Sequence, residues 1–78
     1  MSDHGAMDIR ALFGRNLKRI RTARGVTQEK LAEKTGLSQQ HISIMEQGRG
    51  NPTIVSVALL AEALEVSHVD LMQPDEAG

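Results

Sequence analysis

Apolar residues recur at helical spacing in five segments of this 78-residue chain, with glycine or polar residues between the segments. In the first segment they fall three or four positions apart, the period of one helical face: Ile9, Leu12, Phe13, Leu17 and Ile20. The pattern predicts a helix from Ile9 to about Arg24. Gly25 would end it, because glycine readily takes the left-handed conformation of a helix C-terminus. No such period precedes Ile9, so residues 1–8 are expected to form a disordered lead.

Two short helices joined by a tight turn are predicted over residues 28–35 and 39–47. Thr27 and Ser38 stand just before them, where a hydroxyl group can accept a hydrogen bond from a free N–H of the first turn. Gly36 can adopt the positive φ that a sharp break between the helices requires. The residues expected to face inward are Leu31, Thr35, Leu37, Ile42 and Met45. Two helices joined in this way form a helix-turn-helix, whose second helix enters the DNA major groove in proteins that use the motif.

The outer face of the segment 39–47 carries no carboxylate that would repel DNA phosphates. With Ile42 pointing inward, the opposite face holds Gln39, Gln40, Ser43, Ile44 and Gln47. Glutamine amides both donate and accept, as the N6 and N7 edge of adenine requires, and Ile44 can pack on a thymine methyl group. We therefore expect the first four of these residues to contact bases. The alternative is an ordinary solvent-exposed helix surface, on which amides are common.

Positive charge is concentrated in one part of the chain, although the net charge is −1. All nine Lys and Arg residues lie between Arg10 and Arg49 with three acidic residues among them, so this part carries +6. A basic part beside acidic ends is typical of a protein that meets phosphates on one side. Lys18 and Arg19 on the outer face of the first helix, and Arg49 in the loop after the third, are therefore expected phosphate contacts. Chance segregation of solvated charges is the alternative.

The segment from Ile54 to about Leu64 is apolar almost all round, which predicts a helix covered on two faces. Thr53 is its expected N-cap, and the core needs only Ile54, Val57, Leu60, Ala61 and Leu64. In so short a chain we expect the second cover to be another copy of the protein. Ser67 begins a short fifth helix. The candidate dimer contacts are Val55, Leu59, Val69 and Met72, unless these are merely scattered exposed apolar residues.

The chain is therefore expected to be an all-α protein with one small domain over residues 9–73 and a frayed tail over residues 74–78. The absence of cysteine excludes disulfides and thiolate metal sites, and a single aromatic residue, Phe13, in effect excludes stacking on single-stranded nucleic acid. No segment is long and apolar enough to predict a membrane span, and the N-terminus lacks the pattern of a signal peptide. We expect a cytoplasmic protein without cofactor or metal.

These residues resemble the Cro/lambda-repressor-type helix-turn-helix domains, the XRE family, from about Phe13 to Met72. The matching positions are Leu17, Arg21, Gly25, Thr27, Gln28, Leu31, Ala32, Thr35, Gly36, Leu37, Ser38, Ile42, Glu46, Gly48, Asn51, Pro52, Thr53, Ala61, Ala63, Leu64 and Val66. The resemblance implies a compact lambda-repressor-like domain of five helices that binds operator DNA as a dimer, with each recognition helix in a major groove. The chain is also similar to short regulators without a second domain: restriction–modification controller proteins, plasmid or phage repressors, and antitoxin-like repressors.

The resemblance implies further contacts to phosphates. Gln28 matches a phosphate-binding glutamine at the start of a helix, where free backbone N–H groups already favour an anion. We add Thr27 and Ser38, at the starts of the two helices, and Asn51 in the loop as expected phosphate contacts.

The resemblance also refines the third helix. Its base-reading positions match those named above, but the position of Ile44 is often polar in the family, which limits Ile44 to contact with a methyl group. Arg21 and Glu46 match an ion pair that ties the first helix to the third, so Glu46 is expected to be structural rather than catalytic.

The expected function is that of a homodimeric transcriptional regulator that recognises a pseudo-palindromic operator in double-stranded DNA, with its own gene as the target. An antitoxin-type module that masks a partner protein through its acidic, apolar C-terminal third, and binds DNA secondarily, is the main alternative. Non-specific nucleoid binding is disfavoured, because base-facing amides would serve no purpose. Catalysis is not expected, because His4, His41 and His68 lie far apart without metal-ligand spacing.

Overall fold

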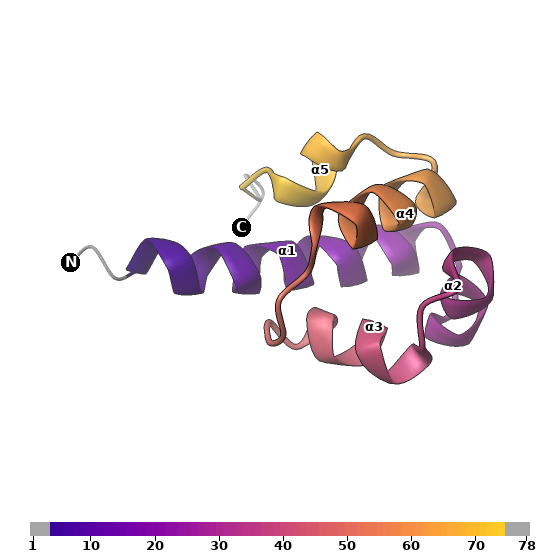
Figure 1. The fold of residues 1–78 in the computed structure, drawn as a ribbon. Helices are drawn as coiled ribbons and strands as arrows, with labels where there is room; N and C mark the ends of the chain where they lie inside the picture. Colours follow the sequence, from indigo (N-terminus) through magenta and orange to yellow (C-terminus); the bar gives the residue numbers. More distant parts are fainter. Residues whose placement is uncertain (1–3, 75–78) are drawn as a thin grey trace.

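The computed structural model describes residues 4–74, which form five α-helices around one apolar core (Figure 1). The helices are α1 (His4–Ala23), α2 (Gln28–Thr35), α3 (Gln39–Glu46), α4 (Ile54–Leu64) and α5 (His68–Met72). α1 runs through the middle of the molecule, with α4 and α5 on one side and α3 on the other, while α2 closes one end. The predicted all-α fold of five helices is thus confirmed over the described residues.

The helix boundaries follow local signals. Four hydroxyl residues in extended backbone precede α2 to α5, and each accepts a hydrogen bond from an N–H of the first turn: Thr27, Ser38, Thr53 and Ser67. Such a cap stabilises a helix by about 1 kcal/mol. Gly36 ends α2 with φ of 83°, and its N–H donates to the Ala32 carbonyl oxygen at 2.8 Å. These signals place α2 and α4 at the predicted residues, and α3 ends at Glu46, one residue before the predicted end.

α1 is longer than the apolar pattern predicts, because it begins at His4 rather than Ile9. The expected disordered lead over residues 1–8 is therefore wrong for residues 4–8, while residues 1–3 lie outside the described residues. A helix whose later turns are packed can propagate backwards without an apolar face, and Ala6 and Met7 are good helix formers. Ile9 is 53% exposed, so the packed part of α1 starts only near Phe13. At the other end Pro74 lacks regular structure, and the rest of the expected tail lies outside the described residues.

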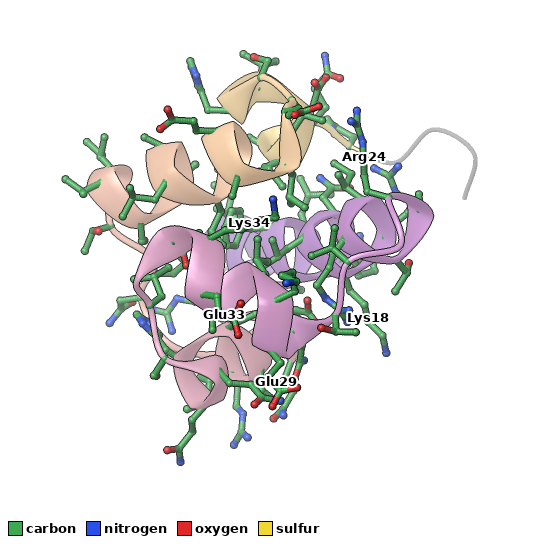
Figure 2. The ribbon with its side chains drawn as sticks, turned by 90° about the vertical axis from the view of Figure 1, so that its right-hand side faces the viewer. Lys18, Arg24, Glu29, Glu33 and Lys34 are labelled. Atoms are coloured by element: carbon green, nitrogen blue, oxygen red, sulfur yellow. The ribbon has the colours of Figure 1, made fainter. Side chains whose placement is uncertain are left out.

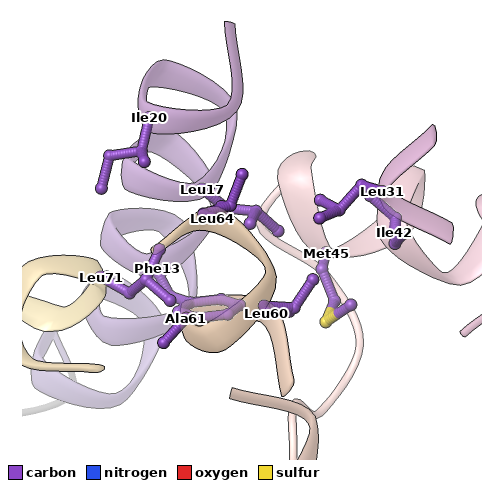
Figure 3. Close-up of a cluster of buried hydrophobic side chains, with 10 residues drawn as sticks. All are labelled: Phe13, Leu17, Ile20, Leu31, Ile42, Met45, Leu60, Ala61, Leu64 and Leu71. Atoms are coloured by element: carbon purple, nitrogen blue, oxygen red, sulfur yellow. The ribbon is translucent and has the colours of Figure 1, made fainter. Parts of the chain in front are cut away.

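All five helices contribute to the core (Figure 3). Its buried side chains are those of Phe13, Leu17, Ile20, Leu31, Ile42, Met45, Leu60, Ala61, Leu64 and Leu71. Three of the five residues expected to face inward from the helix-turn-helix belong to this set, whereas Thr35 and Leu37 are half-buried.

Ile54 corrects the expectation for the fourth helix, because it is 89% exposed instead of facing the core. The core-facing position in the first turn of α4 belongs to Ser56, which is 4% exposed. The Ser56 hydroxyl oxygen accepts a hydrogen bond from the Thr53 N–H at 2.9 Å, and the hydroxyl donates to the Thr53 carbonyl oxygen at 2.9 Å. The start of α4 is thus held by its capping box, and Ile54 is left in solvent.

α1 and α3 approach each other closely at Gly14. A Cβ atom at this position would lie 2.4 Å from the Met45 carbonyl oxygen and 3.0 Å from the carbonyl oxygen of Glu46. No side chain fits there without displacing the backbone of α3. Gly14 therefore sets how closely the end of α3 can pack against α1.

Asn16 ties the C-terminal end of the fold to α1. Its side chain is 0% exposed, and Nδ2 donates to the Leu71 carbonyl oxygen at 2.9 Å and to the Gln73 carbonyl oxygen at 2.7 Å. Carbonyl groups at a helix C-terminus lack partners within the helix, so a buried amide that satisfies them is stabilising. Oδ1 of Asn16 accepts a hydrogen bond from Arg19 Nη2 at 2.9 Å.

Candidate nucleic-acid interface

The outer face of α3 is polar and accessible. Gln39 and Gln40 are exposed in its first turn, and Ser43 and Ile44 are half-buried in its second. The loop after α3 partly covers Ile44, because a Cβ atom at Gly50 would lie 3.3 Å from the Ile44 Cγ2 atom. The structure therefore brings the four residues expected to contact bases onto one helix face, with Ile44 at its edge.

The only carboxylate of α3, that of Glu46, turns inward and joins the three helices of this region. It accepts hydrogen bonds from Arg21 Nε at 2.5 Å and Arg21 Nη2 at 3.1 Å, a bidentate pairing, and from Gln28 Nε2 at 2.9 Å. Arg21 Nη1 also donates to the Val26 carbonyl oxygen at 2.8 Å. The side chains of Arg21 and Glu46 are 11% and 4% exposed. This ion pair, which the sequence suggested, holds α3 against α1 and against the start of α2.

Gln28 has a structural role besides the phosphate contact expected of it. One N–H of its amide is used by Glu46, and its other N–H makes no hydrogen bond among the described residues. Gln28 is the first residue of α2, where backbone N–H groups are unpaired and favour an anion. Thr27 and Ser38 are exposed caps, so each hydroxyl lies at a helix start where a phosphate can approach.

The structure separates the two basic residues expected on the outer face of α1. Lys18 borders a polar hollow together with residues of α2 and α3. Arg19 lies on the other flank, where it donates to Asn16 and borders a hollow beside α5. Figure 2 shows the same division, with Lys18 on the side of α1 near α3 and Arg24 on the side near α4. Lys18, and not Arg19, therefore shares a surface with the outer face of α3.

The two residues of the loop after α3 that are expected to contact phosphates also lie in different places. Arg49 Nη2 donates to Gln47 Oε1 at 2.5 Å, so this guanidinium group lies against the end of α3. Asn51 is exposed and borders an apolar hollow that Ile9 and Pro52 also line. Of the two loop residues expected to contact phosphates, Arg49 is the one in contact with α3.

Exposed apolar side chains occur on α4 and α5. Ile54, Val55, Val69 and Met72 are 89%, 67%, 46% and 39% exposed. Ile54 and Met72 border apolar hollows beside these helices and the loop before α4, whereas Val55 and Val69 border neither hollow. Two apolar hollows adjoin there, because Pro52, Val57 and Met72 border both. We term this region the α4–α5 surface.

Leu59 is less exposed than the other three candidate dimer contacts. It is half-buried and borders a separate hollow between α2 and α4, together with Lys34, Glu62 and Glu65. Figure 2 shows Lys34 on the side of α2 turned toward α4. Met72 borders both apolar hollows and Ile54 borders one of them, so the structure favours Met72 and adds Ile54. Val55 and Val69 stay exposed candidates on the same two helices.

The sequence did not indicate the roles of three residues that matter for this architecture: Gly14, Asn16 and Gln47. A signal existed for Asn16, because it is a polar residue within the apolar stripe of the first helix. Gly14 carried no such signal, since the closeness of two helices depends on both partners. Gln47 was placed on the outer face of its helix without a role.

The described part of the chain holds neither a membrane-spanning helix nor a cluster of metal ligands. Over residues 4–74, no helix combines the length and apolar character needed to span a membrane. Within the same residues, no three His, Asp or Glu side chains gather closely enough to hold a metal ion.

Known proteins share both the sequence pattern and the fold. The helix-turn-helix family HTH_3 matches residues 17–71. The chain is 47% identical over 70 residues to the uncharacterized HTH-type transcriptional regulator y4dJ of Sinorhizobium fredii, covering 90% of this chain and 91% of that protein. The restriction-modification controller protein C.AhdI from Aeromonas hydrophila superposes with a TM-score of 0.77 at 35% identity, covering 80% of this chain and 94% of that one. The hypothetical transcription factor NHTF from Neisseria gives a TM-score of 0.83 at 30% identity, covering 88% and 79%.

Proposed function

Since the chain belongs to the helix-turn-helix family HTH_3, we propose that it is a transcriptional regulator that binds a specific site in double-stranded DNA. One observation carries the proposal: α3 presents Gln39, Gln40 and Ser43 outward, while its only carboxylate is turned inward and paired with Arg21. A helix that enters a DNA groove must keep negative charge away from phosphates and offer hydrogen-bonding groups to base edges. The outer face of α3 meets both requirements.

Phosphate contacts beside α3 would fix its position in the groove. Lys18 and Gln28 border a hollow that Ser43 and Gln47 also line, at the unpaired N–H groups of α2. Arg49 is hydrogen-bonded to Gln47 at the C-terminal end of α3. Such contacts supply affinity for any sequence, whereas the contacts to base edges supply specificity. The proposed activity is therefore binding rather than catalysis, and it would take place in the cytoplasm, where the DNA is.

The proposal includes a homodimer formed through the α4–α5 surface. This surface exposes Ile54, Val55, Val69 and Met72, and burying such side chains stabilises an association. α5 and α3 lie on opposite sides of α1, so a second copy can cover the α4–α5 surface while α3 stays accessible (Figure 1). Two copies related by a two-fold axis would contact two half-sites about one helical turn apart on a pseudo-palindromic operator.

Footprinting on the DNA upstream of the protein's own gene, over a series of salt concentrations, tests the DNA-binding proposal. We expect a protected pseudo-palindrome. Gln39→Ala and Gln40→Ala should each weaken binding to it by about 1–3 kcal/mol and leave binding to random DNA almost unchanged. Gln73→Ala removes the same amide from an exposed residue beyond α5 and should change neither affinity. Equal losses on the protected site and on random DNA would refute the base-contact assignment.

Ile54→Glu tests the dimer. A charge at this 89% exposed position leaves the monomer folded but cannot be buried against a second copy, so sedimentation should shift from dimer to monomer. Thr22→Glu adds the same charge to an exposed residue of α1 and should leave the dimer intact. A dimer unaffected by Ile54→Glu would exclude the α4–α5 surface as its interface. A monomeric wild-type protein that gives no footprint would instead favour the antitoxin-type module, with the α4–α5 surface covered by a partner protein.

A further inference from the structure

Three side chains at the C-terminal end of α3 form a chain of hydrogen bonds. Arg49 Nη2 donates to Gln47 Oε1 at 2.5 Å, and Gln47 Nε2 donates to Ser43 Oγ at 3.2 Å. Gln47 and Ser43 are four residues apart and so share one helix face. The backbone returns Arg49 to this face, because Gly48 has φ of 81° and the Arg49 N–H donates to the Ile44 carbonyl oxygen at 3.1 Å. We term these three side chains the Ser43 relay.

The chemistry of the groups gives the Ser43 relay one direction. A guanidinium group has only donors, so the atom of Gln47 that faces Arg49 is its amide oxygen. The amide nitrogen of Gln47 then faces Ser43, and an amide nitrogen only donates. Ser43 Oγ is therefore the acceptor in this pair, although a serine hydroxyl is in general able to do either.

The hydroxyl hydrogen of Ser43 is left for an outside acceptor. Thr22 and Thr35, which also lie within or at the end of helices, donate to carbonyl oxygens of the preceding turn at 2.9 Å and 2.8 Å. The Ser43 hydroxyl makes no such bond among the described residues, and the only hydrogen bond of this hydroxyl there is the one it accepts from Gln47. Its hydroxyl is thus available as a donor on the outer face of α3.

We infer that Gln47, held by Arg49, determines base specificity by making Ser43 a hydrogen-bond donor toward DNA. The inference rests on the proposed function and concerns which base Ser43 selects. A donor suits the major-groove acceptors, which are purine N7, guanine O6 and thymine O4. Cytosine alone among the four bases offers an amino donor and no acceptor there, so a donor disfavours cytosine. An unconstrained serine pairs with either kind of group and discriminates poorly.

The orientation of the Ser43 hydroxyl affects binding only where water is excluded. In the free protein the relay is exposed, so water can satisfy any orientation of the Ser43 hydroxyl. Against a base edge, two facing donors or two facing acceptors leave polar groups unpaired, which costs more than the bond itself gains. Arg49 has further N–H groups beyond the one on Gln47, so the same side chain can bind a phosphate and set the relay.

The experiment selects binding sites from randomised double-stranded DNA with the purified full chain and compares base frequencies at each position. In wild type, one position per half-site should disfavour cytosine, the one base without a major-groove acceptor. Ser43→Ala should weaken this base preference by about fivefold, the effect of one hydrogen bond. Gln47→Glu provides a carboxylate that accepts from both neighbours, so Ser43 should turn its lone pairs outward. The preference at that position should then change to cytosine, which offers only an amino donor in the major groove.

Two controls separate this effect from the added charge. Gln47→Met removes both hydrogen bonds of the relay without adding a charge. It should weaken the base preference at that position without reversing it. Ser43→Ala combined with Gln47→Glu should abolish the reversal, because the reversal acts through the hydroxyl. Gln47 is exposed, and circular dichroism should show all variants folded.

The outcomes distinguish the inference from the function on which it rests. If wild type enriches a site but both Gln47 variants keep its base frequencies, the inference is wrong and the proposed function stands. If the double variant still shows the reversal, the added charge acts directly and the relay has no role. If wild type enriches no sequence at all, the proposed function fails and the inference with it.

Discussion

Glu46→Gln tests whether the buried ion pair holds α3 in place. The substitution keeps the size and shape of the side chain but removes the charge that Arg21 pairs with, and Arg21 is largely buried. The Glu46 carboxylate accepts three hydrogen bonds, two from Arg21 and one from Gln28. A glutamine offers one oxygen to these donors and turns an amino group toward the rest. The variant therefore leaves a buried guanidinium group without its counter-charge.

The expected loss in the free energy of unfolding follows from this geometry. Removing one partner of a buried pair costs about 3–5 kcal/mol, and we take about 3 because Arg21 keeps its bond to the Val26 carbonyl oxygen. A domain of this size has a free energy of unfolding of about 4–12 kcal/mol. Its unfolding entropy is about 0.16 kcal/mol/K, so the midpoint of thermal unfolding should fall by about 18 °C.

Urea and thermal unfolding of four proteins measure the effect: wild type, Arg21→Met, Glu46→Gln and the double variant. We expect the double variant to be more stable than the two single losses predict, with a coupling energy of about 2 kcal/mol. Glu33→Ala breaks the exposed pair with Lys30, at 3.6 Å, and should cost less than about 0.5 kcal/mol. Additive single losses, or a Glu46→Gln variant that loses no more than Glu33→Ala, would refute the reasoning.

Two further substitutions test the packing around α1. Gly14→Ala puts a methyl group 2.4 Å from the Met45 carbonyl oxygen, so we expect a loss of about 1–3 kcal/mol in urea unfolding. An unchanged midpoint would show that α3 moves away from α1 at little cost. Asn16→Ala leaves the carbonyl groups of Leu71 and Gln73 without their buried donor and should cost about 2–3 kcal/mol. Hydrogen exchange should then speed up in α5 more than in α2, and uniform exchange would argue against a specific tie.

The resemblance to the XRE-type helix-turn-helix regulators is confirmed by the family match, and the elements that carried it are local. Thr27 and Ser38 cap their helices and Gly36 takes a left-handed conformation, as predicted from residue type alone. Caps and turns depend on a few neighbouring residues, so the sequence is sufficient to place them. The outer face of α3 was predicted in the same way, because one inward residue fixes the direction of all the others on a helix.

Helical periodicity gave a wrong answer for two residues of α4. Ile54 has the spacing of a core residue, yet the chain enters α4 before it reaches the core, and Ser56 takes the inward position. Leu59 has the spacing of an outward residue, yet it is half-buried and borders a hollow that Lys34 of α2 also lines. In both cases the helix face was known, but the position of the neighbouring element was not.

The sequence by itself determined the helices, their ends, the inward and outward faces, and the family. The tertiary structure alone decided which distant residues meet. Asn16 meets the end of α5, and Gly14 meets the backbone of α3. Lys18, rather than Arg19, lies beside the outer face of α3. The tertiary structure also decided the direction in which Gln47 points its amide. The physical reason is that helical period and caps act within a few residues, whereas the separation and crossing of helices are set by side chains packed together from remote segments.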